Sequence, residues 1–480
     1  MNKRLVKNYI YNTLYQILVL IVPLVTTPYV SRILGVTNIG IFQYAQSVAT
    51  YFVLVGAVGT SLYGQREIAY LQDNLVESTK AFWEIELFRV IGVVISTIVY
   101  FLSLCIHGEY PDVYLVLIIE VLATAFDISW FFMGKEEFKL TVIRNTIIKL
   151  SGVVCVFLFV KSPDDLLIYT ACMTFPIFIG NISLWFSLKD YLIKITISYS
   201  ELFRGIIARL TRIFILFLPQ VAMEVYLVLD KTMLGLLGTS VDQVGYYSQA
   251  QKIVKVVLSI VTSLGVVMLP TMSSFFARGD KEGIKESIIK AFRFIFIISF
   301  ALMFGLCAVA ERFVPIFFGE GYDPVIILMI IISPIIVIIG ISTVFGRQYL
   351  LPTNQQKEFT ISIIIGAVVN VVLNIVLIPI MDAVGASIAT VLAELTITVI
   401  QAWLVRKQLP LKQCFRSIFK YAIFGAIMYF ACISVGHYLP QNKIWAIGLI
   451  VITGMIVYFL ELLISRDSFF EEIKALKNEQ

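Results

Sequence analysis

Charged residues are scarce in this chain of 480 residues: Asp, Glu, Lys and Arg together make up 14% of it. Soluble globular domains usually carry about 25% charged residues, so this composition excludes an ordinary soluble protein. Hydrophobic residues make up 59% of the chain, and the mean hydropathy is +0.91. The sequence therefore predicts an integral membrane protein.

The usual motifs of catalytic and metal sites are also missing. The six cysteines form no CxxC or CxxH pair, so neither a disulfide framework nor a zinc site is indicated. The two histidines, His107 and His437, belong to no motif, and no glycine-rich phosphate loop is present. We therefore expect a protein without a cofactor or a metal, which is not an enzyme and is not driven directly by ATP.

Long apolar runs fill most of the chain. A membrane-spanning helix needs about 20 largely apolar residues. The runs predict an all-α, polytopic membrane protein with about fourteen transmembrane helices, near residues 8–34, 40–64, 81–105, 113–133, 141–160, 165–188, 212–237, 245–276, 288–310, 324–350, 358–380, 383–405, 416–438 and 443–464.

The basic residues orient these helices. Cytoplasmic connections carry an excess of Lys and Arg. With the N-terminus placed inside, only Lys161, Arg312 and Lys443, of 37 Lys and Arg residues, fall in outer segments. We therefore expect both termini in the cytoplasm. The longest connection, residues 189–211, is then also cytoplasmic, and we expect its basic residues on the membrane surface.

An internal repeat divides the chain. "LGVTNIGIFQYAQSV" begins at Leu34 and "LGTSVDQVGYYSQAQKI" begins at Leu237. Their matching Gly, aromatic, Ala and Gln residues are offset by 205 residues, and each copy joins the first two helices of a half. We expect two parallel six-helix lobes, residues 1–195 and 200–408, followed by two extra helices and a cytoplasmic tail in 409–480. Two such lobes typically enclose a central cavity, and their movement opens this cavity alternately to the two sides of the membrane.

Polar residues share one helix face after each copy of the repeat. Residues three and four apart on a helix lie on the same side. The face in the second copy consists of Ser248, Lys252, Lys255 and Ser259, and the same face in the first copy consists of Gln43, Ser47 and Thr50. One interpretation is that both faces line a cavity. The alternative is that the long lysine side chains extend along the helix to the external surface of the membrane.

Further charged and polar residues lie inside predicted membrane helices. They are Glu120 and Asp127, seven residues apart; Gln220, Glu224 and Lys231; Asp230; and Ser387, Thr390, Glu394 and Gln401. Ionisable groups within the membrane usually face a bundle interior or a water-filled cavity. Simple polar contacts between helices are the alternative. Asp230 and Lys231 are adjacent, so their side chains diverge by about 100°; we expect Lys231 to face a cavity and Asp230 a neighbouring helix.

Three stretches carry a family resemblance: "PYVSRILGVTNIGIFQYAQS", "LYGQREIAY" and "LDKTMLGLL…VGYYSQAQKI". They resemble the bacterial polysaccharide (oligosaccharide-lipid) flippases of the multidrug, oligosaccharidyl-lipid and polysaccharide exporter superfamily. The resemblance implies two six-helix lobes, often with two additional helices. It also implies movement of an undecaprenyl-pyrophosphate-linked oligosaccharide from the inner to the outer leaflet of the bacterial cytoplasmic membrane, for capsule, O-antigen or exopolysaccharide synthesis. Polysaccharide polymerase machinery is the implied partner.

Such a substrate needs cations in a wet cavity, because its pyrophosphate is negatively charged. The candidates for this contact are Arg32, Lys231, Lys252 and Lys255, with Arg89 and Lys149 nearer the inner side. Arg66 and Glu67, in "YGQREIA", are candidates for an inner gate. An ordinary ion pair at the membrane surface explains them equally well.

Two other functions remain open. A drug or cation antiporter of the same superfamily would need an acid-dominated cavity, which the lysines argue against. A membrane polysaccharide polymerase would need a sizeable outer loop for its catalytic groups, and the sequence shows none. The acids Glu120, Asp127, Glu224, Asp230 and Glu394 are candidates for lining the cavity or for coupling to protons or sodium. Passive exchange driven by downstream polymerisation is the alternative to such coupling.

Overall fold

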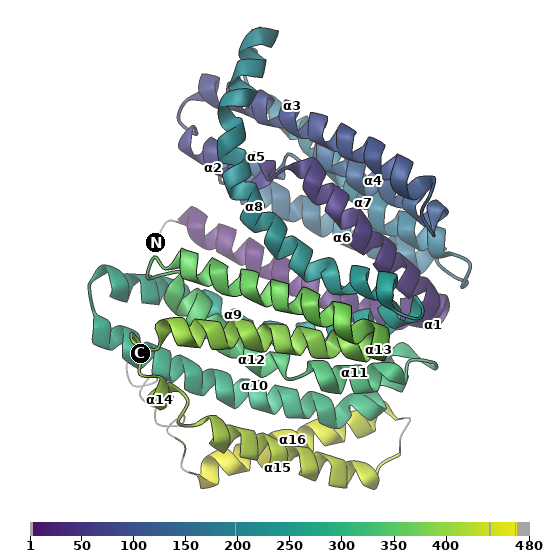
Figure 1. Ribbon diagram of the computed structural model, residues 1–480, viewed down its shortest axis with the longest axis vertical. Helices are drawn as coiled ribbons and strands as arrows, with labels where there is room; N and C mark the ends of the chain where they lie inside the picture. Colours follow the sequence, from purple (N-terminus) through teal and green to yellow (C-terminus); the bar gives the residue numbers. More distant parts are fainter. Residues whose placement is uncertain (1–2, 197, 441–442, 466, 468–480) are drawn as a thin grey trace. The chain divides into compact units, whose positions relative to one another are not determined.

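The computed structural model describes residues 3–196, 198–440, 443–465 and 467, without the side chains of residues 3–14, 218–220, 222–223 and 264–271. Every regular element in these residues is a helix (Figure 1). The predicted all-α fold class is therefore confirmed. The chain forms two compact units: unit 1 contains Met1–Gly235 and Ser240–Gly245, and unit 2 contains Leu236–Thr239 and Tyr246–Gln480.

Unit 1 is built around one long interrupted helix and a set of shorter ones. Helices α3, α4 and α6 pack against α1, and α7 packs between α4 and α6. Their bounds are α1 Lys3–Ala57, α2 Thr60–Tyr70, α3 Leu75–Tyr100, α4 Pro111–Ala123, α5 Ser129–Gly134, α6 Phe138–Phe159, α7 Leu166–Trp185 and α8 Tyr199–Leu237. A π-helical turn, Phe101–Cys105, and two 3₁₀ turns, Thr124–Phe126 and Phe186–Asp190, extend α3, α4 and α7.

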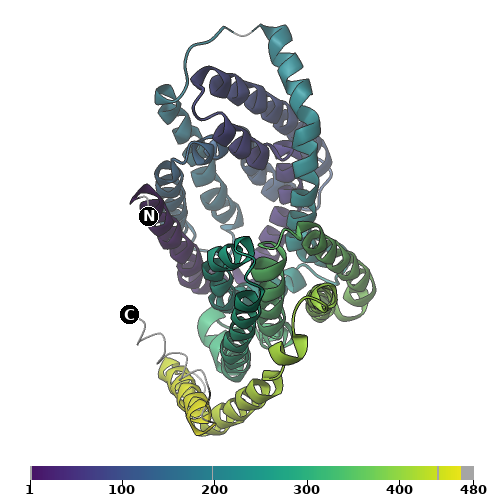
Figure 2. The ribbon, with the colours of Figure 1, turned by 90° about the vertical axis from the view of Figure 1, so that its left-hand side faces the viewer.

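Unit 2 has α10 at its centre. Helices α11, α12, α15 and α16 all pack against α10, and the C-terminal pair α15 and α16 lie side by side (Figures 1 and 2). The bounds are α9 Asp242–Ala277, α10 Lys281–Phe318, α11 Pro324–Ile332, α12 Ile335–Thr343, α13 Gln356–Val405, α14 Leu411–Cys414, α15 Ile418–His437 and α16 Ile444–Ile464. A π-helical turn, Val344–Leu350, follows α12.

Two helices are too long to be single membrane spans. At about 1.5 Å per residue, the 55 residues of α1 would extend about 80 Å, whereas the apolar core of a bilayer is about 30 Å thick. A non-helical residue divides each: Gly35 in α1, with φ 73° and ψ 174°, and Asp382 in α13, with φ 49° and ψ −129°. Each of these helices therefore supplies two of the spans that the sequence predicts.

Ten helical stretches among the described residues are long and apolar enough to cross a membrane. Two of them, Tyr15–Tyr70 and Gln356–Val405, contain the divided helices. The predicted spans at 212–237 and 245–276 lie in α8 and α9, which are not among the ten. A multi-pass membrane protein is thus confirmed, and the count of fourteen stays a prediction.

Two predicted segments differ from the structure in detail. The span predicted at 113–133 corresponds to the apolar stretch Pro111–Gly134, but its helix is not continuous, because α4 ends at Ala123 and α5 begins only at Ser129. The connection predicted at 189–211 is largely helical from Tyr199 onward, as the first turns of α8. Hydropathy marks apolar length, so it does not indicate where a helix is interrupted within a span or where a polar segment becomes helical.

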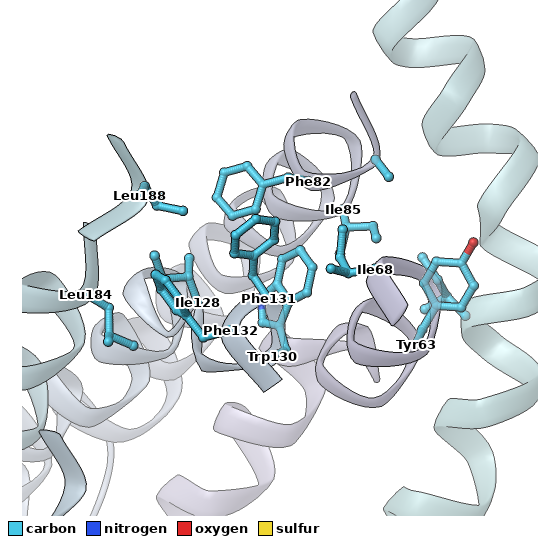
Figure 3. Close-up of a cluster of buried hydrophobic side chains, with 12 residues drawn as sticks. Tyr63, Ile68, Phe82, Ile85, Ile128, Trp130, Phe131, Phe132, Leu184 and Leu188 are labelled. Atoms are coloured by element: carbon cyan, nitrogen blue, oxygen red, sulfur yellow. The ribbon is translucent and has the colours of Figure 1, made fainter. Parts of the chain in front are cut away.

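An aromatic cluster holds one end of unit 1 together (Figure 3). The rings of Phe82 and Trp130 stack with centroids 5.6 Å apart, and Phe131 meets Phe82 edge to face at 5.1 Å. Gly64 is needed beside Trp130, since a Cβ atom there would lie 2.3 Å from the indole. The cluster joins α2, α3 and α5, and it places Tyr63 beside α8.

The matching glycines of the repeat pack against each other. A Cβ atom on Gly40 would lie 2.2 Å from the carbonyl oxygen of Val241, and one on Gly245 would lie 2.5 Å from that of Val36. Val36 and Val241 are themselves separated by the repeat offset, so the contact is reciprocal. Two backbones approach this closely only where both residues are glycine, because glycine has no Cβ atom.

Candidate functional site

Lys231 ends a row of polar side chains between α8 and the second half of α1. Its Nζ donates to Gln43 Oε1 at 2.7 Å. One turn further along α1, Ser47 Oγ and Thr232 Oγ1 share a hydrogen bond of 2.8 Å, and the Tyr51 hydroxyl donates to Thr232 at 3.0 Å. The predicted residues Gln43, Ser47 and Lys231 thus come together, because residues four apart on α1 present one face to α8.

The other residues predicted near this row are not joined to it by these bonds. Thr50 bonds within its own helix, donating to the Gln46 carbonyl at 2.8 Å. Asp230 is 5% exposed and is buried, whereas Glu224 is half-buried on the same helix. Arg32 is exposed on α1, close to the kink. The side chain of Gln220 lies outside the described residues.

Lys255 ends a second chain of polar groups, in unit 2. Its Nζ donates to Gln251 Oε1 at 3.0 Å, and Gln251 Nε2 donates to the Tyr247 hydroxyl at 3.0 Å. That hydroxyl shares a 2.9 Å hydrogen bond with Thr390 Oγ1 on α13. Gln251 and Thr390 are buried and Lys255 is exposed, so the chain leads from the interior of unit 2 to a cation at its surface.

The polar stripe predicted on α9 is divided by burial. Ser248 is buried, Lys252 is half-buried and Lys255 is exposed. Ser259 Oγ donates to the Val256 carbonyl, at 2.6 Å, within its own helix. The helical spacing therefore identifies a shared face, but only part of that face is accessible within unit 2.

The stripe predicted on the second half of α13 serves partly as a helix contact. Gln401 accepts a hydrogen bond from Ser342 Oγ at 2.9 Å and donates to Ser362 Oγ at 3.1 Å, so it connects α12 with both halves of α13. Ser387 bonds to a carbonyl one turn earlier. Glu394 is half-buried. For Gln401, the contacts in the structure are therefore those of a polar link between helices, which was the alternative to lining a cavity.

Arg89 lies at the centre of a buried network in unit 1. It is 1% exposed, and its Nε donates to Thr60 Oγ1 at 2.9 Å. Its two terminal nitrogens donate to Ser61 Oγ and to the Asp127 carbonyl oxygen. Arg89 is therefore committed to protein contacts, unlike the accessible inner cation that the sequence suggests, while Lys149 is half-buried on α6.

Asp127 shapes the break between α4 and α5. Its Oδ1 accepts the Ser129 backbone N–H at 3.1 Å, a local turn that competes with helix, and it lies 3.6 Å from Arg144 Nη1. Arg144 also donates to Asn181, which ties α7 to the break. Because the chain from Glu120 to Asp127 is not one continuous helix, their spacing of seven does not place them on one face. Glu120 is half-buried on α4.

Arg209 joins three helices at the aromatic end of unit 1. Its Nε donates to Glu84 Oε2 at 2.7 Å, and its Nη1 donates to the Tyr63 hydroxyl at 3.1 Å and to Glu67 Oε1. Gly205, one turn earlier on α8, leaves room for Glu84, since a Cβ atom there would lie 2.0 Å from Glu84 Oε1. The planar guanidinium of the half-buried Arg209 is well suited to hold two carboxylates at once.

Glu67 therefore pairs with Arg209, and its sequence neighbour Arg66 points elsewhere. Arg66 is exposed, and its Nε donates to the Tyr70 hydroxyl at 3.2 Å. Whether Arg66 and Glu67 act at a gate stays a prediction. The two residues make separate contacts in the structure.

Sequence reasoning missed Glu84, Glu86, Arg144 and Arg209. Three of them were visible as charges inside predicted spans, which is the signal that singled out Glu120 and Asp127. Glu86, 2% exposed, lies one turn before Arg89. Arg209 had no such signal, because its helix was interpreted as a surface connection. No group of three or more His, Cys, Asp and Glu that is able to hold a metal ion occurs in the part of the chain that the structure describes.

Residues 5–276, more than half of the chain, match the family described as polysaccharide biosynthesis protein. This chain belongs to that family. The "putative O-antigen transporter" of Escherichia coli (strain K12) is 25% identical over 406 residues, which cover 83% of this chain and 96% of the relative. The family assignment made from the repeat motifs is therefore confirmed.

Solved structures agree on the fold. A lipid II flippase, MurJ, in an inward closed conformation aligns with a TM-score of 0.76 at 16% identity, covering 95% of this chain and 99% of that one. A multidrug resistance MATE family transporter in an inward-facing conformation aligns with a TM-score of 0.62 at 11% identity, covering 81% and 94%. The chain thus has the fold of the exporter superfamily. The transporter and flippase names agree with the prediction that it is not an enzyme.

Proposed function

We propose that this protein is a flippase that moves an undecaprenyl-pyrophosphate-linked oligosaccharide repeat unit from the inner to the outer leaflet. The O-antigen transporter and lipid II flippase among its relatives support a lipid-linked glycan as the class of substrate. The product supplies capsule, O-antigen or exopolysaccharide synthesis, with polymerase machinery as the downstream partner. The protein acts in the bacterial cytoplasmic membrane, with both termini in the cytoplasm.

The observation that carries the proposal is the placement of lysines at the ends of polar rows. Lys231 is held by Gln43 next to three hydroxyl groups, and Lys255 is held by Gln251 at the end of a buried polar chain. A pyrophosphate binds cations, and sugar hydroxyls bind side chains that both donate and accept hydrogen bonds. Arg32 and Lys252 are the further cations assigned to this role.

Alternating access needs two lobes that move about a shared axis. We assign residues 1–195 and 200–408 to these lobes, and 409–480 to the two extra helices and the tail. The reciprocal contact of Gly40 and Gly245 supports a two-fold relation between the repeat copies.

The acids Glu120, Asp127, Glu224, Asp230 and Glu394 remain the candidates for coupling to protons or sodium. Their positions differ: Asp127 is already bound by Arg144 and by a backbone N–H, while Asp230 is buried beside Lys231. Passive exchange, in which polymerisation removes the product, needs none of them.

A strain that lacks this protein tests the function. We expect it to accumulate complete lipid-linked repeat units on the inner leaflet, measured by extraction and by protection from an external glycosidase. A polymerase defect would instead leave complete units on the outer leaflet. Unchanged lipid-linked intermediates together with increased drug accumulation would favour the antiporter of the same superfamily.

A further inference from the structure

Unit 1 contains a pocket with both polar and apolar lining that the proposed transport path does not use. The pocket has a volume of about 860 Å³ and lies between the first half of α1, the helices α2 and α5, and the start of α6. Glu136, in the connection between α5 and α6, also lines it. That connection is predicted to be cytoplasmic, so the pocket lies near the inner surface of the membrane.

Three side-chain amides line the pocket, those of Gln16, Gln65 and Asn145. None of them forms a hydrogen bond with another residue in the described part of the chain. An amide has two donor hydrogens and an acceptor oxygen. Three such groups around one space are suited to recognise hydroxyl groups, which also donate and accept.

Arg66 supplies a cation at the same pocket. Tyr70, one turn later on α2, positions it: the guanidinium carbon lies 5.5 Å from the centre of the Tyr70 ring, and Nε donates to the Tyr70 hydroxyl at 3.2 Å. An arginine has five N–H donors, and this bond uses one of them. The terminal nitrogens are thus available to form the paired bonds that a phosphate accepts.

Apolar side chains complete the lining, among them Leu62, Met133 and Val142. Leu62 is 47% exposed on the outside of α2. A soluble phosphate ester would leave this apolar surface uncovered, whereas the chains of a lipid would cover it. Glu136 also lines the pocket, and a carboxylate is able to accept hydrogen bonds from hydroxyl groups but repels a phosphate.

We propose that this pocket binds the headgroup of an anionic membrane lipid that carries both a phosphate and free hydroxyl groups, with the phosphate on Arg66 and the hydroxyls on Gln16, Gln65 and Asn145. Two lipids share this chemistry. One is phosphatidylglycerol of the surrounding bilayer. The other is a polyprenyl-linked sugar phosphate, in which case the pocket is an entrance subsite for the substrate and rests on the proposed function.

The test is lipid binding by the purified full-length protein in detergent, measured by native mass spectrometry. The probes are phosphatidylglycerol, phosphatidylcholine, polyprenyl-phosphate-linked glucose and soluble glycerol phosphate. We expect one of the two hydroxylated anionic lipids to bind more tightly than the other probes. Arg66→Ala should weaken that binding about tenfold or more, which is the loss of a hydrogen-bonded charge.

Two further variants make the test specific. Arg278→Ala is the matched control, because Arg278 also stacks on an aromatic ring, at 5.3 Å from Phe275, but does not line the pocket. Asn145→Asp keeps the shape of the side chain and adds a negative charge, so it should weaken phosphate binding as well. It also carries the test if Arg66→Ala is poorly folded.

The outcomes separate the pocket from the transport function. Binding of phosphatidylglycerol that Arg66→Ala abolishes supports the pocket even if the deletion strain shows no flippase defect. Binding of the polyprenyl probe that Arg66→Ala abolishes identifies the entrance subsite. Equal losses in Arg66→Ala and Arg278→Ala, equal binding of phosphatidylcholine, or equally tight binding of glycerol phosphate would each overturn the proposal.

Discussion

The two copies of the repeat obtain their cations in different ways. In the first copy, Gln43 and Ser47 are neutral, and the lysine arrives from α8 as Lys231. In the second copy, α9 carries Lys252 and Lys255 itself, at the positions that correspond to Ser47 and Thr50. What both copies share is the close glycine contact. The comparison indicates that the repeat preserves the backbone approach, whereas the charge is placed independently in each copy.

The lysines should give the largest effect if both copies contribute a working cation. We expect Lys231→Ala and Lys255→Ala each to lower glycan export, per unit of protein in the membrane, about tenfold or more, since a charge-assisted hydrogen bond contributes about 1.5–3 kcal/mol. Lys→Arg at the same positions retains the charge and should recover part of the export. Normal export from both Ala variants at normal abundance would show that these lysines do not bind the substrate. The different placement of the lysines in the two copies would then be unrelated to transport.

The glycines should give a stability effect of similar size in both copies. Gly40→Ala and Gly245→Ala each force a methyl group against a carbonyl oxygen, so each should destabilise the protein by about 1–3 kcal/mol. The measurement is the thermal midpoint of the purified protein in detergent. Gly448→Ala is the control, because nothing lies within 4 Å of a Cβ atom there. A large loss from one glycine and none from the other would contradict the two-fold relation.

The amides that hold the lysines should give the smallest effect. Gln43→Leu and Gln251→Leu leave each lysine in place but remove the amide oxygen that accepts a hydrogen bond from it, so we expect export to fall only a few-fold, from the loss of about 1 kcal/mol of positioning. Thr50→Val is the matched control. Its hydroxyl bonds only to its own helix, and its effect should stay within about 0.5 kcal/mol. Equal losses from all three variants would mean that the amides do not position the lysines.

The membrane fold was largely predictable, because it depends on apolar length and on basic loops. The long apolar runs predict most of the helices, and motif spacing predicts the shared face of Gln43 and Ser47, although it does not predict their contact with Lys231. The break at Asp127 was not predictable, since it depends on Arg144 and on a backbone N–H in three dimensions. Nor was the pairing of Glu67 with Arg209, because 142 residues separate them and a sequence does not give the partner of a charge.

The kinks at Gly35 and Asp382 have a consequence for mapping the protein in cells. Each reverses the chain without an extended loop, so neither offers a place for an inserted epitope or a protease site. Gly108 is also unsuitable for a cysteine reporter, because a Cβ atom there would lie 2.4 Å from the Leu104 carbonyl oxygen. Gly279 and Gly321 have open space around the Cβ position, but their φ angles of 71° and 82° would strain any other residue there. Cysteine reporters therefore fit better at the exposed neighbours Arg278 and Glu320, which are predicted to lie on opposite sides of the membrane and can be read in living cells.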